Sequence, residues 1–317
     1  MEELLNLNSV SIGYAGKGKK RGLNLAVTNV SFSIRKGEIF GLMGESGSGK
    51  TTIGRAIMGM VDTVEGDILY KGMKINQKLS AGNKRQLCHE MQMIFQDPMA
   101  SLNERAKVSD IICEGLLATK HMMSKMEREN LIDKTMLEVG LRPEYKNRYP
   151  TEFSGGQRQR IGIARALIMN PQFIVADEPI SALDVSVRAQ ILNLMKKLQK
   201  TRGLTYLFIS HDMSVMRYFT DRIAVLYHGN IVEIAPTNLL FHNPYHPYTK
   251  MLLSSIPKPE PTKIKRWGEI GEMHGNQSNR IQESQERKNG FISIKDKGSK
   301  AQRMIERAPG HYVLECL

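Results

Sequence analysis

A glycine-rich segment near residue 50 has the composition of a loop that binds phosphate. It reads Gly44-Glu45-Ser46-Gly47-Ser48-Gly49-Lys50-Thr51. Glycines allow the backbone to wrap closely around an anion, so that its N–H groups point inward. Lys50 can then reach the β- and γ-phosphates of a nucleotide, and the Thr51 hydroxyl can ligate Mg²⁺. Because the segment lies between an expected strand at 38–43 and an expected helix at 50–60, it predicts ATP binding.

An acidic pair further along the chain could supply a metal ligand and a base. Asp177 and Glu178 follow an apolar run at 173–176 that reads as a buried strand. Ligands of open α/β sheets bind at the carboxyl ends of strands, where Asp177 could hold Mg²⁺ through water. Glu178 could polarise a water molecule for in-line attack on the γ-phosphate. Alone this pair is a weak signal, but downstream of the glycine-rich loop it predicts ATP hydrolysis.

A serine and two glycines open another expected helix, at 156–169. The segment reads Ser154-Gly155-Gly156-Gln157. A helix N-terminus offers unpaired N–H groups and the positive end of a dipole to an anion. One ATP does not need two such sites from a single chain, so we infer that two chains share each nucleotide. Seen alone, the segment is also typical of an ordinary capped helix, and that alternative stays open at this point.

These segments need a scaffold in which strands alternate with helices. We expect further helices at 186–200 and within 98–153, where apolar residues recur at helical spacing. Strands are expected at 5–12, 27–34, 38–43, 66–70, 73–75, 91–95, 173–176, 205–209, 222–227 and 230–234. The pattern predicts an α/β fold with a largely parallel sheet and an inserted helical subdomain. After residue 256 prolines interrupt a polar stretch, which indicates a linker and a small C-terminal extension.

The composition limits where the chain can act. It has 317 residues, and no uncharged apolar run approaches the roughly 18 residues that span a bilayer. Its acidic start does not resemble a signal peptide. We therefore expect it to stay in the cytoplasm and to reach a membrane only through partners. Cys88, Cys113 and Cys316 are too far apart for a zinc site, which predicts isolated reduced thiols.

The formal net charge of +13 is compatible with nucleic acid, an anionic membrane surface or no ligand at all. One tight basic cluster, at 17–21, has glycine neighbours and is expected at a solvated hairpin tip. Aromatic residues make up only 6% of the chain and do not alternate with basic residues, as they would in a stacking platform for single strands. Charge alone therefore does not predict nucleic-acid binding.

The order of these motifs resembles that of the ATP-binding-cassette (ABC) ATPases over roughly residues 5–256. After the phosphate loop come segments like the family's Gln-loop, signature, acidic pair, D-loop and switch histidine: Phe95-Gln96-Asp97-Pro98, Ser154 to Gln157, Asp177-Glu178, Ser181-Ala182-Leu183-Asp184 and Ser210-His211-Asp212. The resemblance implies a P-loop NTPase core at 1–256. It also implies an antiparallel β subdomain, a helical subdomain at about 98–155 and an extension at 257–317.

Four longer segments are similar to the oligopeptide/dipeptide importer branch, which includes importers of nickel and metal chelates. They are QMIFQDPMASL at 92–102, YPTEFSGGQRQ at 149–159, DEPISALDVSV at 177–187 and HPYTKMLLSSIP at 246–257. The residues at 156–165 resemble the second of the two ATPase subunits that such importers usually carry.

The resemblance implies a role for each matching residue. The nucleotide would be bound by Tyr14, stacked on adenine, and by Gly44, Glu45, Ser46, Gly47, Ser48, Gly49, Lys50, Thr51 and Thr52. Thr51, Gln96 and Asp177 would bind the Mg²⁺ ion. Glu178, Gln96 and His211 would be the catalytic residues. The signature residues Ser154, Gly155, Gly156 and Gln157 would bind the ATP of the opposite subunit, and Asp184 would link the two sites. Tyr14 could instead be a core residue at a strand end.

The implied partners are two transmembrane permease subunits, a paralogous ATPase subunit or a second copy, and indirectly an extracellular substrate-binding protein. The chain would lie on the cytoplasmic face of the membrane, with ATP and Mg²⁺ as its ligands and no nucleic acid. Members of the branch often carry a cysteine-rich C-terminal stretch. This tail has only Cys316, so we predict no iron–sulfur cluster. Phe153 replaces the commonest leucine before the signature serine, which changes little.

Two other classes remain as alternatives. The net charge would suit a soluble ATPase of the same superfamily that acts on DNA or ribosomes, although the chain lacks a long coiled-coil insertion and a second cassette. A purely regulatory subunit with a degenerate site is the other alternative, and the presence of every expected catalytic residue opposes it.

Overall fold

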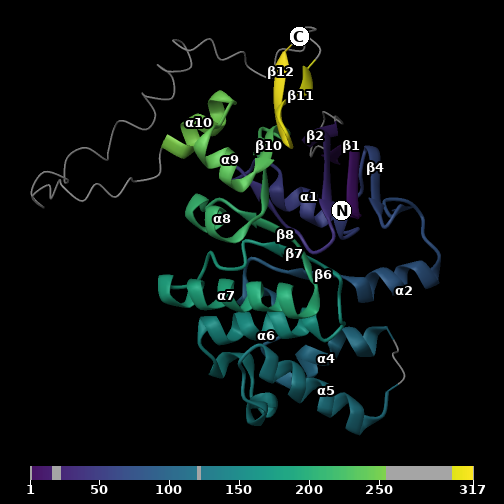
Figure 1. Ribbon diagram of the computed structural model, residues 1–317. Coiled ribbons are helices and arrows are strands. Elements are labelled where there is room, and N and C mark those ends of the chain that lie inside the picture. Colours follow the sequence, from purple (N-terminus) through teal and green to yellow (C-terminus); the bar gives the residue numbers. More distant parts are fainter. Residues whose placement is uncertain (1, 16–22, 120–122, 255–301, 317) are drawn as a thin grey trace, which may run out of the picture.

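Two β-sheets organise the protein. The computed structural model describes residues 2–15, 23–119, 123–254 and 302–316, so the basic cluster at 17–21 lies outside the described residues (Figure 1). The larger sheet has the strand order β11-β12-β10-β9-β3-β8-β7-β6. Its strands are β3 (Ile39–Met43), β6 (Met91–Ile94), β7 (Phe173–Asp177), β8 (Thr205–Ser210), β9 (Arg222–Tyr227), β10 (Asn230–Pro236), β11 (Gln302–Ala308) and β12 (His311–Cys316).

The centre of the larger sheet is parallel, as predicted. Strands β6, β7, β8, β3 and β9 pair in parallel, and β10 and β12 continue the sheet in antiparallel pairing. Strands β3, β7 and β8 are buried along their whole length, and they consist mainly of apolar residues because both faces of the sheet are covered. On β8, Tyr206 and Phe208 enter one core cluster and Leu207 and Ile209 the other.

Helices cover both faces of this sheet. Helix α1 (Lys50–Ile57) packs on the face that receives Leu207 and Ile209. Helices α7 (Val185–Arg202) and α8 (Met213–Phe219) pack on the other face. α1 ends earlier than predicted because Gly59 has a left-handed φ of 68°, which does not continue a helix.

The smaller sheet is antiparallel and has the order β2-β1-β4-β5. Its strands are β1 (Glu3–Ala15), β2 (Leu23–Arg35), β4 (Glu65–Tyr70) and β5 (Met73–Lys74). Val10, Ile12 and Val27 are buried in the same core cluster as α1. The sheet therefore lies over the helix that follows the phosphate loop.

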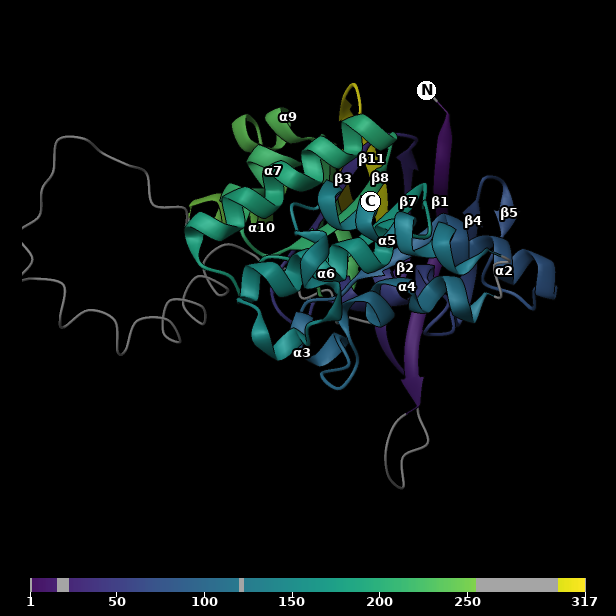
Figure 2. The same ribbon diagram turned by 90° about the horizontal axis from the view of Figure 1, so that it is seen from below.

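The helical region lies at one end of the molecule, and in the view of Figure 2 its helices lie in front of the larger sheet. It comprises α3 (Pro98–Ser101), α4 (Val108–Ala118), α5 (Lys125–Glu138), two 3-10 turns (Pro143–Asn147 and Pro150–Glu152) and α6 (Gly155–Leu167). Ile112, Met136 and Ile161 form its buried centre. A capping box between Ser124 and Glu127 starts α5, where helical spacing is predicted.

Within the described residues, four helices have no predicted counterpart: α2 (Ala81–Glu90), α8 (Met213–Phe219), α9 (Thr237–His242) and α10 (Pro247–Ser254). α2 has no buried residue, so no apolar stripe marked it in the sequence. Within the described ranges, every helix is too short or too polar to span a bilayer.

The C-terminal hairpin of β11 and β12 extends the larger sheet (Figure 1). β12 pairs with β10 through Glu233↔Val313 and Ile234↔Tyr312. A free edge of β10 would expose unpaired backbone groups, and the hairpin satisfies them. The extension at 257–317 is described only over 302–316, and there it is continuous with the core.

Candidate nucleotide site

The phosphate loop connects β3 to α1, and tight backbone packing dictates its glycines. A Cβ at Gly44 would lie 2.2 Å from the carbonyl oxygen of Leu226. Gly49 has a φ of 108°, and a Cβ there would lie 2.9 Å from the carbonyl oxygen of Ala26. Both positions exclude a side chain because a backbone carbonyl oxygen already occupies the space. The loop is therefore fixed between the end of the parallel sheet and the smaller sheet.

Lys50 points back into this loop. Its Nζ donates to the carbonyl oxygens of Gly44 at 2.8 Å and Glu45 at 2.7 Å, and to Ser48 Oγ at 3.5 Å. Burial lowers the pKa of Lys50, while the carboxylates of Glu178, Asp177 and Glu45 act to raise it. Charged phosphate oxygens are stronger acceptors than peptide carbonyls, so they would compete for this ammonium group.

Thr51 and Asp177 form a pair suited to a magnesium ion. The Thr51 hydroxyl donates to Asp177 Oδ1 at 3.0 Å, and Asp177 is only 3% exposed. Burial raises the pKa of Asp177, and the Thr51 hydrogen bond opposes that shift. Hydroxyl and carboxylate oxygens are ligands that Mg²⁺ accepts. Among the described residues no three His, Cys, Asp or Glu side chains form a metal-ligand cluster, so this pair would need phosphate or water as further ligands.

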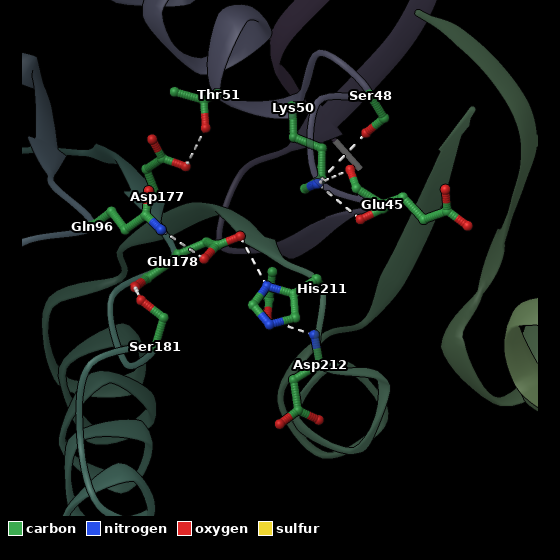
Figure 3. Close-up of polar contacts among 12 residues, drawn as sticks. Glu45, Ser48, Lys50, Thr51, Gln96, Asp177, Glu178, Ser181, His211 and Asp212 are labelled. Atoms are coloured by element: carbon green, nitrogen blue, oxygen red, sulfur yellow. Dashed lines mark hydrogen bonds and ion pairs between the residues drawn. The ribbon is translucent and has the colours of Figure 1, made fainter. Parts of the chain in front are cut away.

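Glu178 is held between two side chains from distant parts of the chain (Figure 3). Gln96 Nε2 donates to Glu178 Oε2 at 3.0 Å, and His211 Nδ1 lies 2.9 Å from Glu178 Oε1. The Glu178 backbone has a left-handed φ of 44°, and its N–H donates to the carbonyl oxygen of Ile209 at 3.0 Å. Such a conformation costs roughly 1 kcal/mol or more in a non-glycine residue and marks a position that its surroundings impose.

The structure thus brings together the residues that the sequence predicts to be catalytic. Glu178 follows β7, His211 follows β8 and Gln96 follows β6, so all three lie at the carboxyl ends of neighbouring parallel strands. The His211 side chain is 55% exposed and that of Glu178 is 12% exposed. An accessible imidazole beside a largely buried carboxylate can contact a phosphate and orient a water molecule.

Tyr14 lies near the phosphate loop rather than in the core. Its hydroxyl is 3.3 Å from Thr52 Oγ1, and the residue is 44% exposed. The alternative that Tyr14 is a core tyrosine is therefore wrong. An exposed ring beside the start of α1 is available for stacking on a base.

The signature segment caps the N-terminus of α6. This is expected both for an anion-binding site and for an ordinary capped helix. Ser154 Oγ accepts from Gln157 N at 3.4 Å, and Ser154 N donates to Gln157 Oε1 at 3.0 Å. Gly156 also has a packing role, because a Cβ there would lie 2.5 Å from Val187 Cγ1 on α7. These contacts fix the segment at the N-terminus of α6. Ser154 and Gly155 are exposed there.

The D-loop segment owes its shape to a residue that the sequence did not reveal. Arg188 donates to the carbonyl oxygens of Leu183 at 2.6 Å and Ser181 at 3.1 Å. Asp184 is exposed at the N-cap of α7 and makes no side-chain capping hydrogen bond there. The Asp184 carboxylate is therefore not used to cap its own helix. Asp212, the N-cap of α8, differs, because it accepts from Ser214 N at 2.9 Å. An arginine one turn into a helix carries no motif, so no sequence signal marked Arg188.

A cleft of about 1070 Å³ opens beside the Gln96 segment. It lies between the strand that precedes Gln96 and helix α4. Its lining includes Met60, Val61, Leu87, Phe95, Ala118 and Arg165. Polar and charged side chains also line the cleft, among them Asn76, Lys84 and Glu114. The cleft touches both the core and the helical region.

Comparisons with known proteins agree with this geometry. A family model described as "ABC transporter" matches residues 27–181, and one described as "Oligopeptide/dipeptide transporter, C-terminal region" matches residues 232–285. The chain is 56% identical over 276 residues to the oligopeptide transport ATP-binding protein OppF of Streptococcus pyogenes serotype M1, covering 87% of this chain and 89% of the relative. It is 58% identical over 260 residues to the oligopeptide transport ATP-binding protein AmiF of Streptococcus pneumoniae serotype 4, covering 82% and 83%.

A solved structure is similar as well. It is a dimeric ATP-binding cassette in a post-hydrolysis state bound to ADP and phosphate. The TM-score is 0.66 at 30% sequence identity, and the match covers 74% of this chain and 99% of the other.

Proposed function

Because the chain belongs to the ABC transporter ATPases and carries the C-terminal region of the oligopeptide/dipeptide branch, we propose that it hydrolyses ATP to energise the import of peptides. The predicted family and fold class are confirmed. The relatives named above are oligopeptide transport ATP-binding proteins, which favours peptides over nickel or metal chelates as the cargo. These relationships do not favour a soluble ATPase that acts on DNA or ribosomes.

The observation that carries this proposal is the placement of the Glu178 carboxylate. It lies next to the Thr51–Asp177 pair and is oriented by Gln96 and His211. In this position Glu178 would accept a hydrogen bond from the attacking water and aim its oxygen at the γ-phosphate. His211 would contact the γ-phosphate and steady that water.

The phosphate loop prepares the leaving group. Lys50 would exchange the carbonyls of Gly44 and Glu45 for the β- and γ-phosphate oxygens, which the loop's N–H groups and the α1 N-terminus also bind. Thr51 and Asp177 would hold Mg²⁺, with Gln96 beside it, and the ion would neutralise charge on the phosphates. Tyr14 would stack on the adenine.

We further propose that two such subunits close around two ATP molecules. The exposed N-terminus of α6 presents Ser154 and Gly156 to a nucleotide outside its own phosphate loop, and Asp184 lies exposed where a second subunit could contact it. The similar solved structure is dimeric, which supports this arrangement. The partner would be a paralogous ATPase subunit or a second copy.

The membrane partners would dock in the cleft beside Gln96. A cleft of about 1070 Å³ that is lined by both apolar and charged side chains suits a short amphipathic helix from a permease subunit. Phe95 lines the cleft, and the next residue, Gln96, donates to Glu178. A permease helix that displaces Phe95 would therefore also shift Gln96 and change the position of the Glu178 carboxylate. Two permease subunits, with an extracellular substrate-binding protein beyond them, would hold this chain on the cytoplasmic face of the membrane.

The test replaces Glu178 by Gln. A carboxamide is a poor base, so turnover of ATP should fall about 10²- to 10⁴-fold while ATP binding persists. Uptake of labelled dipeptides should be lost in cells that carry only Glu178→Gln, whereas uptake of radioactive Ni²⁺ should be unchanged. Glu129→Gln, an exposed position on α5, is the matched control and should leave both uptakes unchanged. Parental hydrolysis by Glu178→Gln would refute the role of Glu178, and parental dipeptide uptake would refute peptides as the cargo.

A further inference from the structure

One peptide unit of the phosphate loop is held at both ends. The carbonyl oxygen of Gly44 accepts from Lys50 Nζ at 2.8 Å. The N–H of the same peptide unit belongs to Glu45, and it donates to the Tyr248 hydroxyl at 3.3 Å. Tyr248 lies on α10, which is 203 residues further along the chain and inside the segment that matches the oligopeptide/dipeptide C-terminal region. A helix outside the ATPase motifs therefore contacts the loop that binds phosphate.

The Tyr248 side chain is rigidly packed. It is fully buried, and its ring centroid lies 4.1 Å from that of Tyr227 at the end of β9. The turn between β9 and β10, which follows Tyr227, also contacts the phosphate loop, because Gly229 N donates to the carbonyl oxygen of Ser48 at 3.0 Å. Burial raises the pKa of Tyr248, so the hydroxyl keeps its proton at physiological pH. Its position is thus set by the protein core rather than by solvent.

Buried polar contacts fix the start of α10. His246 Nδ1 accepts from Tyr248 N at 3.2 Å. Glu233 on β10 is fully buried and accepts from Tyr245 N at 2.8 Å, from His246 N at 3.0 Å and from His311 Nε2 at 2.6 Å. His311 belongs to β12 of the C-terminal hairpin. The hairpin, β10 and α10 are therefore joined through one carboxylate.

We propose that Tyr248 is a positioning residue for ATP binding, which goes beyond the ATPase assignment itself. When Lys50 moves to the phosphates, the Gly44 carbonyl loses its contact to the ammonium group. The Tyr248 hydroxyl then holds the same peptide unit by its N–H and prevents it from rotating. The following N–H groups of the loop stay aimed at the phosphates, so less conformational freedom is lost on binding. In this role Tyr248 would act through the Glu45 N–H and would touch neither the nucleotide nor the reacting water.

The test is Tyr248→Phe, which removes only the hydroxyl. The loss of one hydrogen bond should weaken ATP binding about three- to tenfold. We expect this factor in the Kd for ATP, measured by titration calorimetry without Mg²⁺ to prevent hydrolysis, and in the KM for ATP. The kcat should stay within about twofold, because Glu178, Gln96 and His211 are untouched.

Tyr206→Phe is the matched control. Tyr206 is also fully buried, but it pairs with Ile39 at the opposite end of β8 and β3 from the loop. Its loss should leave the Kd and KM for ATP unchanged, even if both variants lower the melting temperature. The proposal is overturned if Tyr248→Phe binds ATP within twofold of the parent. It is also overturned if the two variants weaken binding equally, or if Tyr248→Phe lowers kcat without changing KM.

Discussion

Replacing Glu233 by Gln tests whether the C-terminal hairpin is built into the core. The carboxylate is fully buried and accepts three hydrogen bonds. Oε1 receives the N–H of Tyr245 and His311 Nε2, and Oε2 receives the N–H of His246. Gln has the same shape but only one acceptor oxygen. It can keep two of these bonds at most, and its NH₂ group then faces the third donor.

The expected loss follows from these contacts. A hydrogen bond to a charged acceptor contributes about 1.5–3 kcal/mol, and an unpaired buried donor adds a penalty of about 1–3 kcal/mol. Removing a buried charge offsets part of this, because a carboxylate is costly to desolvate. The free energy of unfolding should therefore fall by about 2–3 kcal/mol. For a protein of 317 residues that corresponds to a decrease in Tm of roughly 3–5 °C.

The assay is thermal unfolding followed by circular dichroism, at pH 7.5 and equal protein concentration. Glu306→Gln is the matched control, because Glu306 on β11 also accepts from a backbone N–H, that of Gly310 at 2.8 Å, but is exposed. It should shift the unfolding free energy by less than about 0.5 kcal/mol. Equal Tm values for Glu233→Gln and the parent would refute the reasoning, and so would equal decreases for the two variants.

Two further predictions concern pH and magnesium. Burial lowers the pKa of His246, while Glu233 acts to raise it. The unfolded chain therefore binds a proton below about pH 6.5 that the folded protein does not, and stability should fall as pH decreases from 6.5 toward the lowered pKa. Urea unfolding at pH 7.5 and 5.5 should show a smaller loss for His246→Gln than for the parent, and equal losses would contradict this. Thr51→Val should raise the Mg²⁺ concentration for half-maximal ATPase activity about tenfold, because the proposed metal ligand is lost. Thr51→Ser keeps the hydroxyl and should behave like the parent in the same titration; identical curves for Val and Ser would exclude Thr51 as a ligand.

Local sequence was sufficient for the parallel core. The strands at β3, β7 and β8 are short apolar runs, because both of their faces are covered and no polar alternation is needed. The phosphate loop and the α6 cap were predictable for a similar reason, since glycine conformations and N-caps are properties of a few adjacent residues. Helix α2 was not predictable, because a helix with no buried residue leaves no periodic apolar signal.

The sequence by itself determined which residues are candidates for the chemistry, because their motifs are local and ordered. Only the tertiary structure decided which of them meet. Gln96 and Glu178 are 82 residues apart, and Tyr248 lies 203 residues from Glu45. The first contact arises because parallel strands end at one edge of the sheet, where side chains distant in sequence converge. The second arises because β10 and the C-terminal hairpin bury Glu233, which places α10 against the phosphate loop. No spacing in the chain encodes such a contact, since it depends on which elements share a buried surface.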